Sequence, residues 1–266
     1  MSAPWPPRPV DRAFSALSAL SASFVPVSAF TLLGVSAFDL RSALIFVVCL
    51  VVATAFHEFA HAIVAHRLGD PTPGRDGRVT LNPLVHADPI GTIALPIMAG
   101  LLHAPLFGWG RPVMTQPRFY TRKISMRAGM ALVSFAGPFA NLLQAIVTLI
   151  VLKIVIVSGV HDTGYTGHTG PGAWSIGVGP TSLLGILLIF FKLNLTLALF
   201  NLLPIHPLDG GKILAWMLPA RFSHVDDILA RYGWTILLAL MLIPGLLITL
   251  LTPVDIAAAW AMRLLD

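Results

Sequence analysis

Long apolar stretches alternate along the chain with short segments that carry most of its polar residues. Stretches of about 20 or more mostly apolar residues cover 14–38, 42–65, 128–157, 183–205 and 233–251. Because a helix needs about 20 such residues to cross ~30 Å of hydrocarbon, each stretch is predicted to span a membrane. The pattern predicts an all-α polytopic membrane protein, and 14–38 is interpreted as an uncleaved first span rather than a removed signal peptide.

A sixth apolar stretch, 90–108, is interrupted by prolines and contains three glycines. Proline removes a helical hydrogen bond, so this stretch is a poor continuous helix. We expect it to enter the membrane between the second and third spans without crossing, as a re-entrant or β-like segment, which gives about five to six transmembrane helices. Residues 253–265 are too short for a normal span and are expected to lie along the interface.

Composition supports a single membrane-embedded domain over 1–266. Apolar residues make up 56% of the 266 positions and charged residues 11%, whereas a soluble domain carries roughly a quarter charged residues. Cys49 is the only cysteine, which excludes internal disulfides and cysteine zinc knuckles. The net charge is +5, but the basic residues are scattered between apolar stretches, so no nucleic-acid partner is expected.

The basic residues predict the orientation in the membrane, because loops rich in Lys and Arg stay cytoplasmic. The segment 111–127 carries five Lys or Arg, whereas 159–182 carries none. If 90–108 does not cross, thirteen of the seventeen basic residues are cytoplasmic. The N-terminus is then cytoplasmic as well.

The second predicted span contains the candidate chemistry, where residues 57–61 read HEFAH. His57 and His61 share one helix face, so both imidazoles can bind one zinc ion while Glu58 acts as general base. Glu58 is the only glutamate in the chain. Burying it in hydrocarbon is costly, which favours a functional role. The alternative is a polar patch that holds helices together.

Zinc needs a third protein ligand, and Asp209 is the best candidate. Arg67 stands six residues beyond His61, where a third histidine would be expected in some zinc peptidases, and no glutamate lies downstream. Asp209 follows the fourth span, on backbone that prolines make irregular, which a membrane tolerates only inside protein or beside a wet cavity. Alternatively, Asp209 only caps a short helix over 212–218.

Depth favours the ligand role for Asp209. At 1.5 Å per residue, His57 lies roughly 22 Å from the outer face, about 10 Å or less from the cytoplasmic one. Asp209, just past the fourth span, is near the same level. The two motifs meet only if 90–108 does not cross the membrane.

The chain resembles the site-2 proteases, a family of intramembrane zinc metalloproteases. The resemblance rests on HEFAH at 57–61, GPFAN at 137–141, NLLPIHPLDG at 201–210, and two segments typical of the short bacterial and archaeal branch, NPLVHADPIGT at 82–92 and FGWGRPV at 107–113. It implies a catalytic core over about 42–218 with three spans, without PDZ or cystathionine-synthase-like domains. It also implies one zinc ion per chain on two histidines and one aspartate, and cleavage near the cytoplasmic face.

The resemblance also suggests roles for two asparagines, Asn141 and Asn201, in holding substrate or the developing oxyanion. Hydrogen bonding between helices is the alternative for both. His206 replaces a proline that the family usually has. It either occupies the place of that proline, supports Asp209 or the oxyanion, or binds zinc as a fourth ligand, which would close the position that water needs.

A transmembrane substrate must unwind before its backbone can be cut, since a helix satisfies its own hydrogen bonds. The stretch 78–97 is expected to offer a strand edge to such a substrate, with a plain loop as the alternative. The expected partners are the lipid bilayer and a membrane-protein substrate such as a single-span regulatory protein, cut in regulated intramembrane proteolysis in a prokaryotic cell membrane. The rival functions are a catalytically silent scaffold or transporter of the same fold, or a metal sensor.

Overall fold

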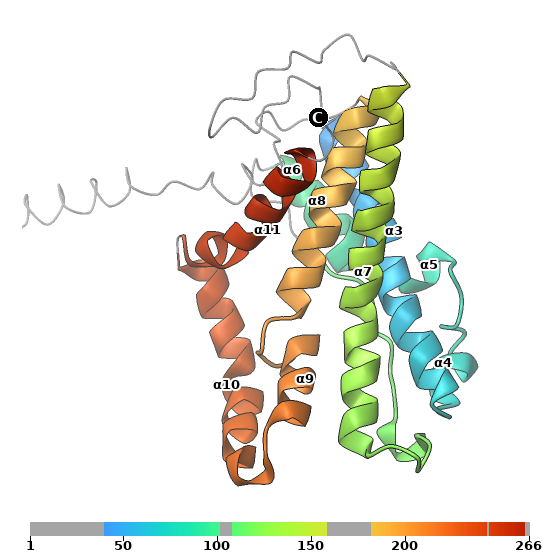
Figure 1. The fold of residues 1–266 in the computed structure, drawn as a ribbon, viewed down its shortest axis with the longest axis vertical. Coiled ribbons are helices and arrows are strands. Elements are labelled where there is room, and N and C mark those ends of the chain that lie inside the picture. Colours follow the sequence, from blue (N-terminus) through green and yellow to red (C-terminus); the bar gives the residue numbers. More distant parts are fainter. Residues whose placement is uncertain (1–39, 102–107, 159–181, 244, 264–266) are drawn as a thin grey trace, which may run out of the picture.

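The computed structural model describes residues 40–101, 108–158, 182–243 and 245–263, and this part of the chain is helical throughout its regular structure (Figure 1). The longer helices are α3 (Leu40–Arg67), α6 (Leu95–Leu101), α7 (Met126–Val157), α8 (Leu183–Asn201), α9 (Asp209–Met217), α10 (Ser223–Leu242) and α11 (Leu246–Arg263). The short turns are α4 (Thr72–Arg75), α5 (Pro83–His86), the π-helix η1 (Pro89–Ala94), and the 3-10 helices η2 (Pro117–Phe119) and η3 (Ala220–Phe222).

Helices α3, α7 and α8 are each long and apolar enough to cross a membrane. They lie side by side and form the centre of the molecule (Figure 1). Ser125 and Ser182 begin α7 and α8, because each side chain accepts a hydrogen bond from a backbone N–H of the first turn. Three of the predicted spans, 42–65, 128–157 and 183–205, are thus confirmed as helices, the last ending at Asn201. The first predicted span, 14–38, lies outside the described residues.

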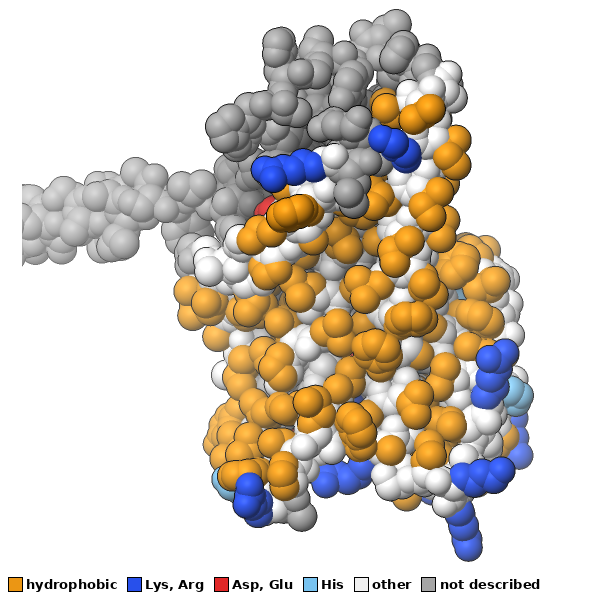
Figure 2. Space-filling view, in the orientation of Figure 1, with side chains coloured by type: hydrophobic (Ala, Val, Ile, Leu, Met, Phe, Trp, Pro, Cys, Tyr) orange, Lys and Arg blue, Asp and Glu red, His pale blue; other side chains and the backbone are white. Residues whose placement is uncertain are grey.

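Small and branched side chains pack between the helices. One cluster joins α3, α6 and α8 through residues such as Leu50, Ala53 and Leu193. On the outside, large apolar side chains of α7 such as Ile146 and Ile154 are more than half exposed. Figure 2 shows hydrophobic side chains over most of the visible face of the helices, a surface that suits lipid rather than water.

The strand edge predicted over 78–97 is wrong, because this stretch folds into the helical turns α5, η1 and α6. Asn82 and Asp88 each precede a proline, and their side chains accept hydrogen bonds from the first N–H groups of α5 and η1. An Asx residue followed by proline starts a helical turn, and this local geometry outweighs the β-branched residues nearby. The extended pairing in this stretch is one isolated antiparallel bridge between Ala87 and Gly110.

The apolar stretch 90–108 begins as η1 and continues as α6. Ala99 of α6 packs in the same cluster as Leu50 of α3 and Leu193 of α8. α6 therefore lies against α3 and α8. Residues 102–107 lie outside the described residues.

The predicted span 233–251 is also wrong, because two helices meet inside it. α10 ends at Leu242, and Ile243 is extended, with ψ of 114°, as the residue before a proline usually is. Gly245 follows Pro244 with φ of +81°, a conformation that glycine adopts without strain. Residues 253–263 belong to α11, whose Ala258 and Ala261 pack with α7 and α8.

Candidate zinc centre

His57, Glu58 and His61 project from the second half of α3 and are all buried. The two histidines are one helical turn apart, so their rings lie on the same face, with centroids 4.6 Å apart. Their Nε2 atoms are 3.0 Å apart. The helix thus brings two imidazole nitrogens to one point, as HEFAH predicts.

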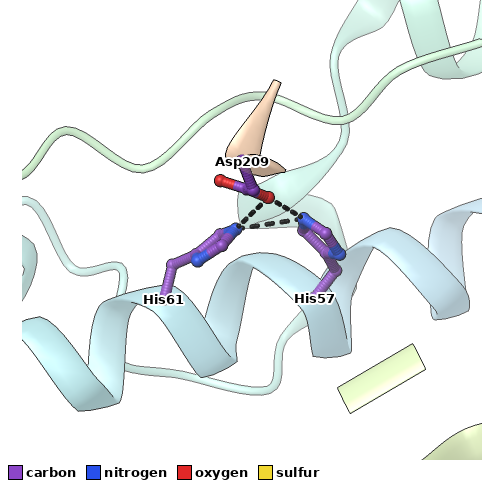
Figure 3. Close-up of side chains that lie close together, drawn as sticks. All are labelled: His57, His61 and Asp209. Atoms are coloured by element: carbon purple, nitrogen blue, oxygen red, sulfur yellow. Dashed lines mark hydrogen bonds and ion pairs between the residues drawn. The ribbon is translucent and has the colours of Figure 1, made fainter. Parts of the chain in front are cut away.

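Asp209 reaches the same point from the start of α9 (Figure 3). Its Oδ2 lies 3.3 Å from His57 Nε2 and 3.2 Å from His61 Nε2. Burial by itself would raise the pKa of Asp209, but the neighbouring His61 and His57 lower it below its ordinary value. Leu208, not Asp209, occupies the cap position of α9, and the expected helix over 212–218 begins instead at Asp209. The side chain therefore faces the histidines rather than capping a helix.

These three side chains fit a zinc ion. Zinc takes imidazole nitrogen and carboxylate oxygen at ~2.0–2.1 Å, so two ligands at a tetrahedral angle lie roughly 3.3 Å apart. The three donor atoms are separated by 3.0, 3.2 and 3.3 Å. The donor set of two histidines and one carboxylate leaves a fourth position open, as a catalytic zinc site requires.

Gly137 of α7 is packed against the histidines. A Cβ at this position would overlap His61 Nε2 and lie 2.6 Å from His57 Nε2. Gly137 therefore lets α7 approach the metal position closely. Neither the apolar pattern nor the spacing of α7 identified this role, although GPFAN contributed to the resemblance.

The other ring nitrogen of each histidine has its own partner on α7. His57 Nδ1 lies 2.6 Å from Asn141 Oδ1, and His61 Nδ1 lies 2.6 Å from the carbonyl oxygen of Val133. Both partners are acceptors, so each Nδ1 carries its proton and each Nε2 keeps a lone pair for metal. Such partners orient a ligand and strengthen its binding.

Glu58 stands beside the three donors but outside the cluster. The backbone N–H of Val113 donates to Glu58 Oε2 at 2.8 Å, which holds the carboxylate in place. Val113 belongs to the segment 111–116, which has no regular secondary structure. This segment is fastened at one end by Gln116 N–H, which donates to the buried Asp70 at 2.5 Å, and at the other by Arg78, which donates to the carbonyl of Arg111 at 3.4 Å.

A cavity of about 440 Å³ opens over Glu58 and the three donors. Its walls come from the segment 111–116, from α7 and from the start of α9. They include Pro112, Val113, Met114, Thr115, Pro117, Tyr120, Met130, Val133, Ser134, Asn201, Pro207, Leu208 and Lys212. The sequence analysis did not predict the segment 111–116 as a cavity wall. Its Gly–Arg–Pro run at 110–112 is a signal for extended backbone, because the residue before proline is restricted to it.

The remaining predicted site residues lie in different places. Asn201 lines the cavity, and its amide donates to the carbonyl of Leu197 one turn earlier. Asn141 is fully buried behind His57 and is not among the cavity-lining residues. His206 points away from the three donors, with Nε2 at 2.8 Å from Asp226 Oδ1 of α10. Lys212, which sequence reasoning treated only as a topology signal, lies with Nζ at 3.7 Å from Asp209 Oδ1.

Two histidines and a glutamate buried on α3, an apolar helix long enough to span a membrane, meet a buried aspartate from α9, and this arrangement is typical of an intramembrane zinc metallopeptidase. Comparison with known proteins agrees with this class. The model of peptidase family M50 matches residues 175–244. YwhC of Bacillus subtilis, named as a candidate zinc metalloprotease, is 36% identical over 198 residues, which cover 74% of this chain and 80% of YwhC.

A second relative, Rip2 of Mycolicibacterium smegmatis, is named in the same way and is 30% identical over 190 residues, which cover 71% of this chain and 63% of Rip2. Rip2 of Mycobacterium tuberculosis H37Rv is 30% identical over 198 residues, covering 73% of this chain and 65% of the relative. No solved structure matches the chain. The chain belongs to peptidase family M50, the site-2 proteases, and is an intramembrane zinc metalloprotease.

Proposed function

We propose that His57, His61 and Asp209 hold the catalytic zinc and that Glu58 is the general base. The observation that carries this proposal is the triangle of three donor atoms, 3.0–3.3 Å on each side, with Glu58 next to it on the same helix. A structural polar patch would satisfy its nitrogens with hydrogen bonds. Here the two Nε2 lone pairs and a carboxylate oxygen converge on one point instead, which only a cation or protons can occupy favourably.

The zinc, when bound, polarises the scissile carbonyl and lowers the pKa of water. Glu58 then accepts a proton from the attacking water and passes it to the leaving amide nitrogen. The N–H of Val113 fixes one oxygen of Glu58 during both transfers. Asn201, on the cavity wall, is placed to hold substrate or the developing oxyanion.

The substrate is a transmembrane or membrane-proximal segment that unwinds locally. Apolar walls such as Met114, Met130 and Leu208 suit the side chains of such a segment, while the polar floor of the cavity holds the chemistry. Unwinding exposes the peptide bond, which a helix would hide. A single-span regulatory protein, cut in regulated intramembrane proteolysis, is the expected substrate class.

The active site faces the cytoplasm of a prokaryotic cell in this proposal. In Figure 2 most of the visible Lys and Arg side chains lie in the lower half, towards the ends of α7 and α10 nearest the site. Exposed Arg75, Arg122 and Arg127 belong to this end, and basic segments stay cytoplasmic. The contact between His57 and Asp209 supports a re-entrant 90–108, which keeps both motifs on one side. The bacterial relatives support a prokaryotic membrane.

Co-expression tests this function. Single-span membrane proteins with tags on both ends are expressed with the wild-type chain or with Glu58→Gln, and their fragments are compared by immunoblotting. We expect at least one of them to be shortened only by the wild-type chain, at a position within or next to its span. Equal shortening by Glu58→Gln would contradict the role of Glu58. Cleavage confined to extracytoplasmic domains would contradict the proposed site of action.

A further inference from the structure

Two fully buried asparagines form a hydrogen-bond chain that ends at His57. The amide of Asn194, on α8, donates to the carbonyl of Phe190 at 2.9 Å. Asn194 Oδ1 accepts from Asn141 Nδ2, also at 2.9 Å, and Asn141 Oδ1 lies 2.6 Å from His57 Nδ1. This hydrogen-bond chain connects three helices, α8, α7 and α3. A buried amide in an apolar helix is costly unless its donors and acceptors are paired, and here they are.

The two side-chain amides of this hydrogen-bond chain can be oriented in only one way. The backbone carbonyl of Phe190 can only accept, so Asn194 must present its nitrogen to Phe190 and its oxygen to Asn141. Asn141 in turn presents its nitrogen to Asn194 and to the carbonyl of Ala53, 3.3 Å away. The oxygen of Asn141 is left for His57. An oxygen acceptor requires the proton on His57 Nδ1, which leaves the Nε2 lone pair directed at Asp209.

The geometry points to Asn194 as a positioning residue of the zinc site, which keeps the amide of Asn141 from flipping. A flipped Asn141 would place its oxygen against two acceptors, Ala53 O and Asn194 Oδ1. It would also offer N–H groups to His57 Nδ1 and thereby favour the tautomer protonated on Nε2, which cannot bind metal there. The inference rests on the proposed role of His57 as a zinc ligand.

Of the two histidines, only His57 depends on the orientation of a side-chain amide. Its Nδ1 lies 2.6 Å from the carbonyl oxygen of Val133, which belongs to the backbone of α7 and cannot flip. His57 depends on a side-chain amide, whose two ends differ only in hydrogen-bonding character. The loss of Asn194 should therefore disturb His57 and leave His61 unchanged.

Zinc affinity in detergent, measured by competition with a chromogenic chelator, tests the inference. Asn141→Leu should weaken zinc binding by about 10- to 100-fold, as the loss of a ligand's partner usually does. Asn194→Leu should weaken it by about 3- to 10-fold, because Asn141 keeps its bond to Ala53. The double variant should bind zinc no more weakly than Asn141→Leu, since Asn194 acts through Asn141.

Gln144→Leu is the matched control, because Gln144 lies on the same helix and donates to the same Ala53 carbonyl at 3.4 Å. It should bind zinc like the wild type. If Asn194→Leu does not fold, Asn194→Ser replaces it. A serine hydroxyl reaches the carbonyl four residues back but is too short to reach Asn141, so the same loss is expected.

Nitrogen NMR of zinc-free protein labelled in histidine is a second test, because it reports which ring nitrogen carries the proton. A purely structural role of Asn194 in packing would not change this result. The wild type should show a proton on Nδ1 of His57 in every molecule, and the Asn194 variants a fraction of molecules without that proton, with His61 unchanged. Wild-type affinity and tautomer in both Asn194 variants, or full additivity with Asn141→Leu, would overturn the inference. If His57→Ala keeps wild-type zinc affinity, the ligand role itself fails. If His57→Ala loses zinc while the Asn194 variants do not, only this inference fails.

Discussion

Gly137 is the residue on which the approach of α7 to the proposed zinc ligands depends. A methyl group there would overlap His61 Nε2 and lie 2.6 Å from His57 Nε2, and neither ring can move freely because α7 holds both Nδ1 atoms. We expect Gly137→Ala to weaken zinc binding by at least about 10-fold, the size of effect seen when the surroundings of a ligand are disturbed. Metal analysis after dialysis against a chelator measures this. Ala136→Ser, which adds one atom at the neighbouring position, should retain zinc.

For His206, unlike Gly137, we predict that substitution leaves zinc binding unchanged. Its imidazole bonds to Asp226 on α10 and lies outside the donor cluster, so His206→Asn should leave about one zinc per chain. The hydrogen-bonded pair is half-buried, and its loss should lower the free energy of unfolding by at most about 1 kcal/mol. Metal analysis and thermal unfolding in detergent separate the two effects. Loss of zinc by a folded His206→Asn protein would make His206 a ligand.

The sequence was sufficient to propose His57, Glu58, His61 and Asp209 as site residues, because ionisable residues beside apolar spans are costly and their spacing has chemical meaning. The residues that hydrogen-bond to these side chains could not be predicted from the sequence in the same way. His61 meets Val133 from 72 residues away, and that contact depends on how α7 crosses α3 rather than on any local pattern. Asn194 did give a signal, an amide within an apolar span, but its partner became visible only in the packed helices.

At the scale of elements, α11 is attached to α8 partly by charge. Lys192 is buried in α8, and its Nζ lies 3.9 Å from Asp255 Oδ1 of α11. Removing Asp255 takes one opposite charge away from the buried ammonium group, so Asp255→Ala should cost about 1–2 kcal/mol of stability. Lys192→Met with Asp255→Leu should be more stable than Asp255→Ala alone. Thermal unfolding in detergent decides this, and a double variant less stable than Asp255→Ala would contradict it.

The apolar pattern correctly predicted α3, α7 and α8, whose runs of apolar residues are uninterrupted. The wrong predictions involved proline. The stretch 233–251 divides into two helices where Ile243 is extended and Gly245 has a positive φ. Asn82 and Asp88 cap helical turns where a strand edge was expected. Hydropathy averages over such residues, whereas local backbone geometry depends on each of them individually.

At the scale of the whole molecule, the proposed orientation predicts which loops face the cytoplasm. In a chain whose Cys49 is replaced by serine, single cysteines at exposed Arg75 and Arg122 should react with an impermeant thiol reagent only after the cytoplasmic side is opened. A cysteine at exposed Ser158, beyond the other end of α7, should react from outside in intact cells. Labelling of Arg75 and Arg122 positions from opposite faces would show that 90–108 crosses the membrane.

The central claim is that one ion, held by His57, His61 and Asp209, works with Glu58 as base. The most direct measurement compares zinc content and substrate cleavage in purified wild type, Glu58→Gln and His57→Ala. The amide keeps the shape of Glu58 but cannot accept the proton, so Glu58→Gln should hold about one zinc per chain and cleave nothing, whereas His57→Ala should lose both. Full cleavage by Glu58→Gln, or full zinc occupancy in His57→Ala, would contradict the account.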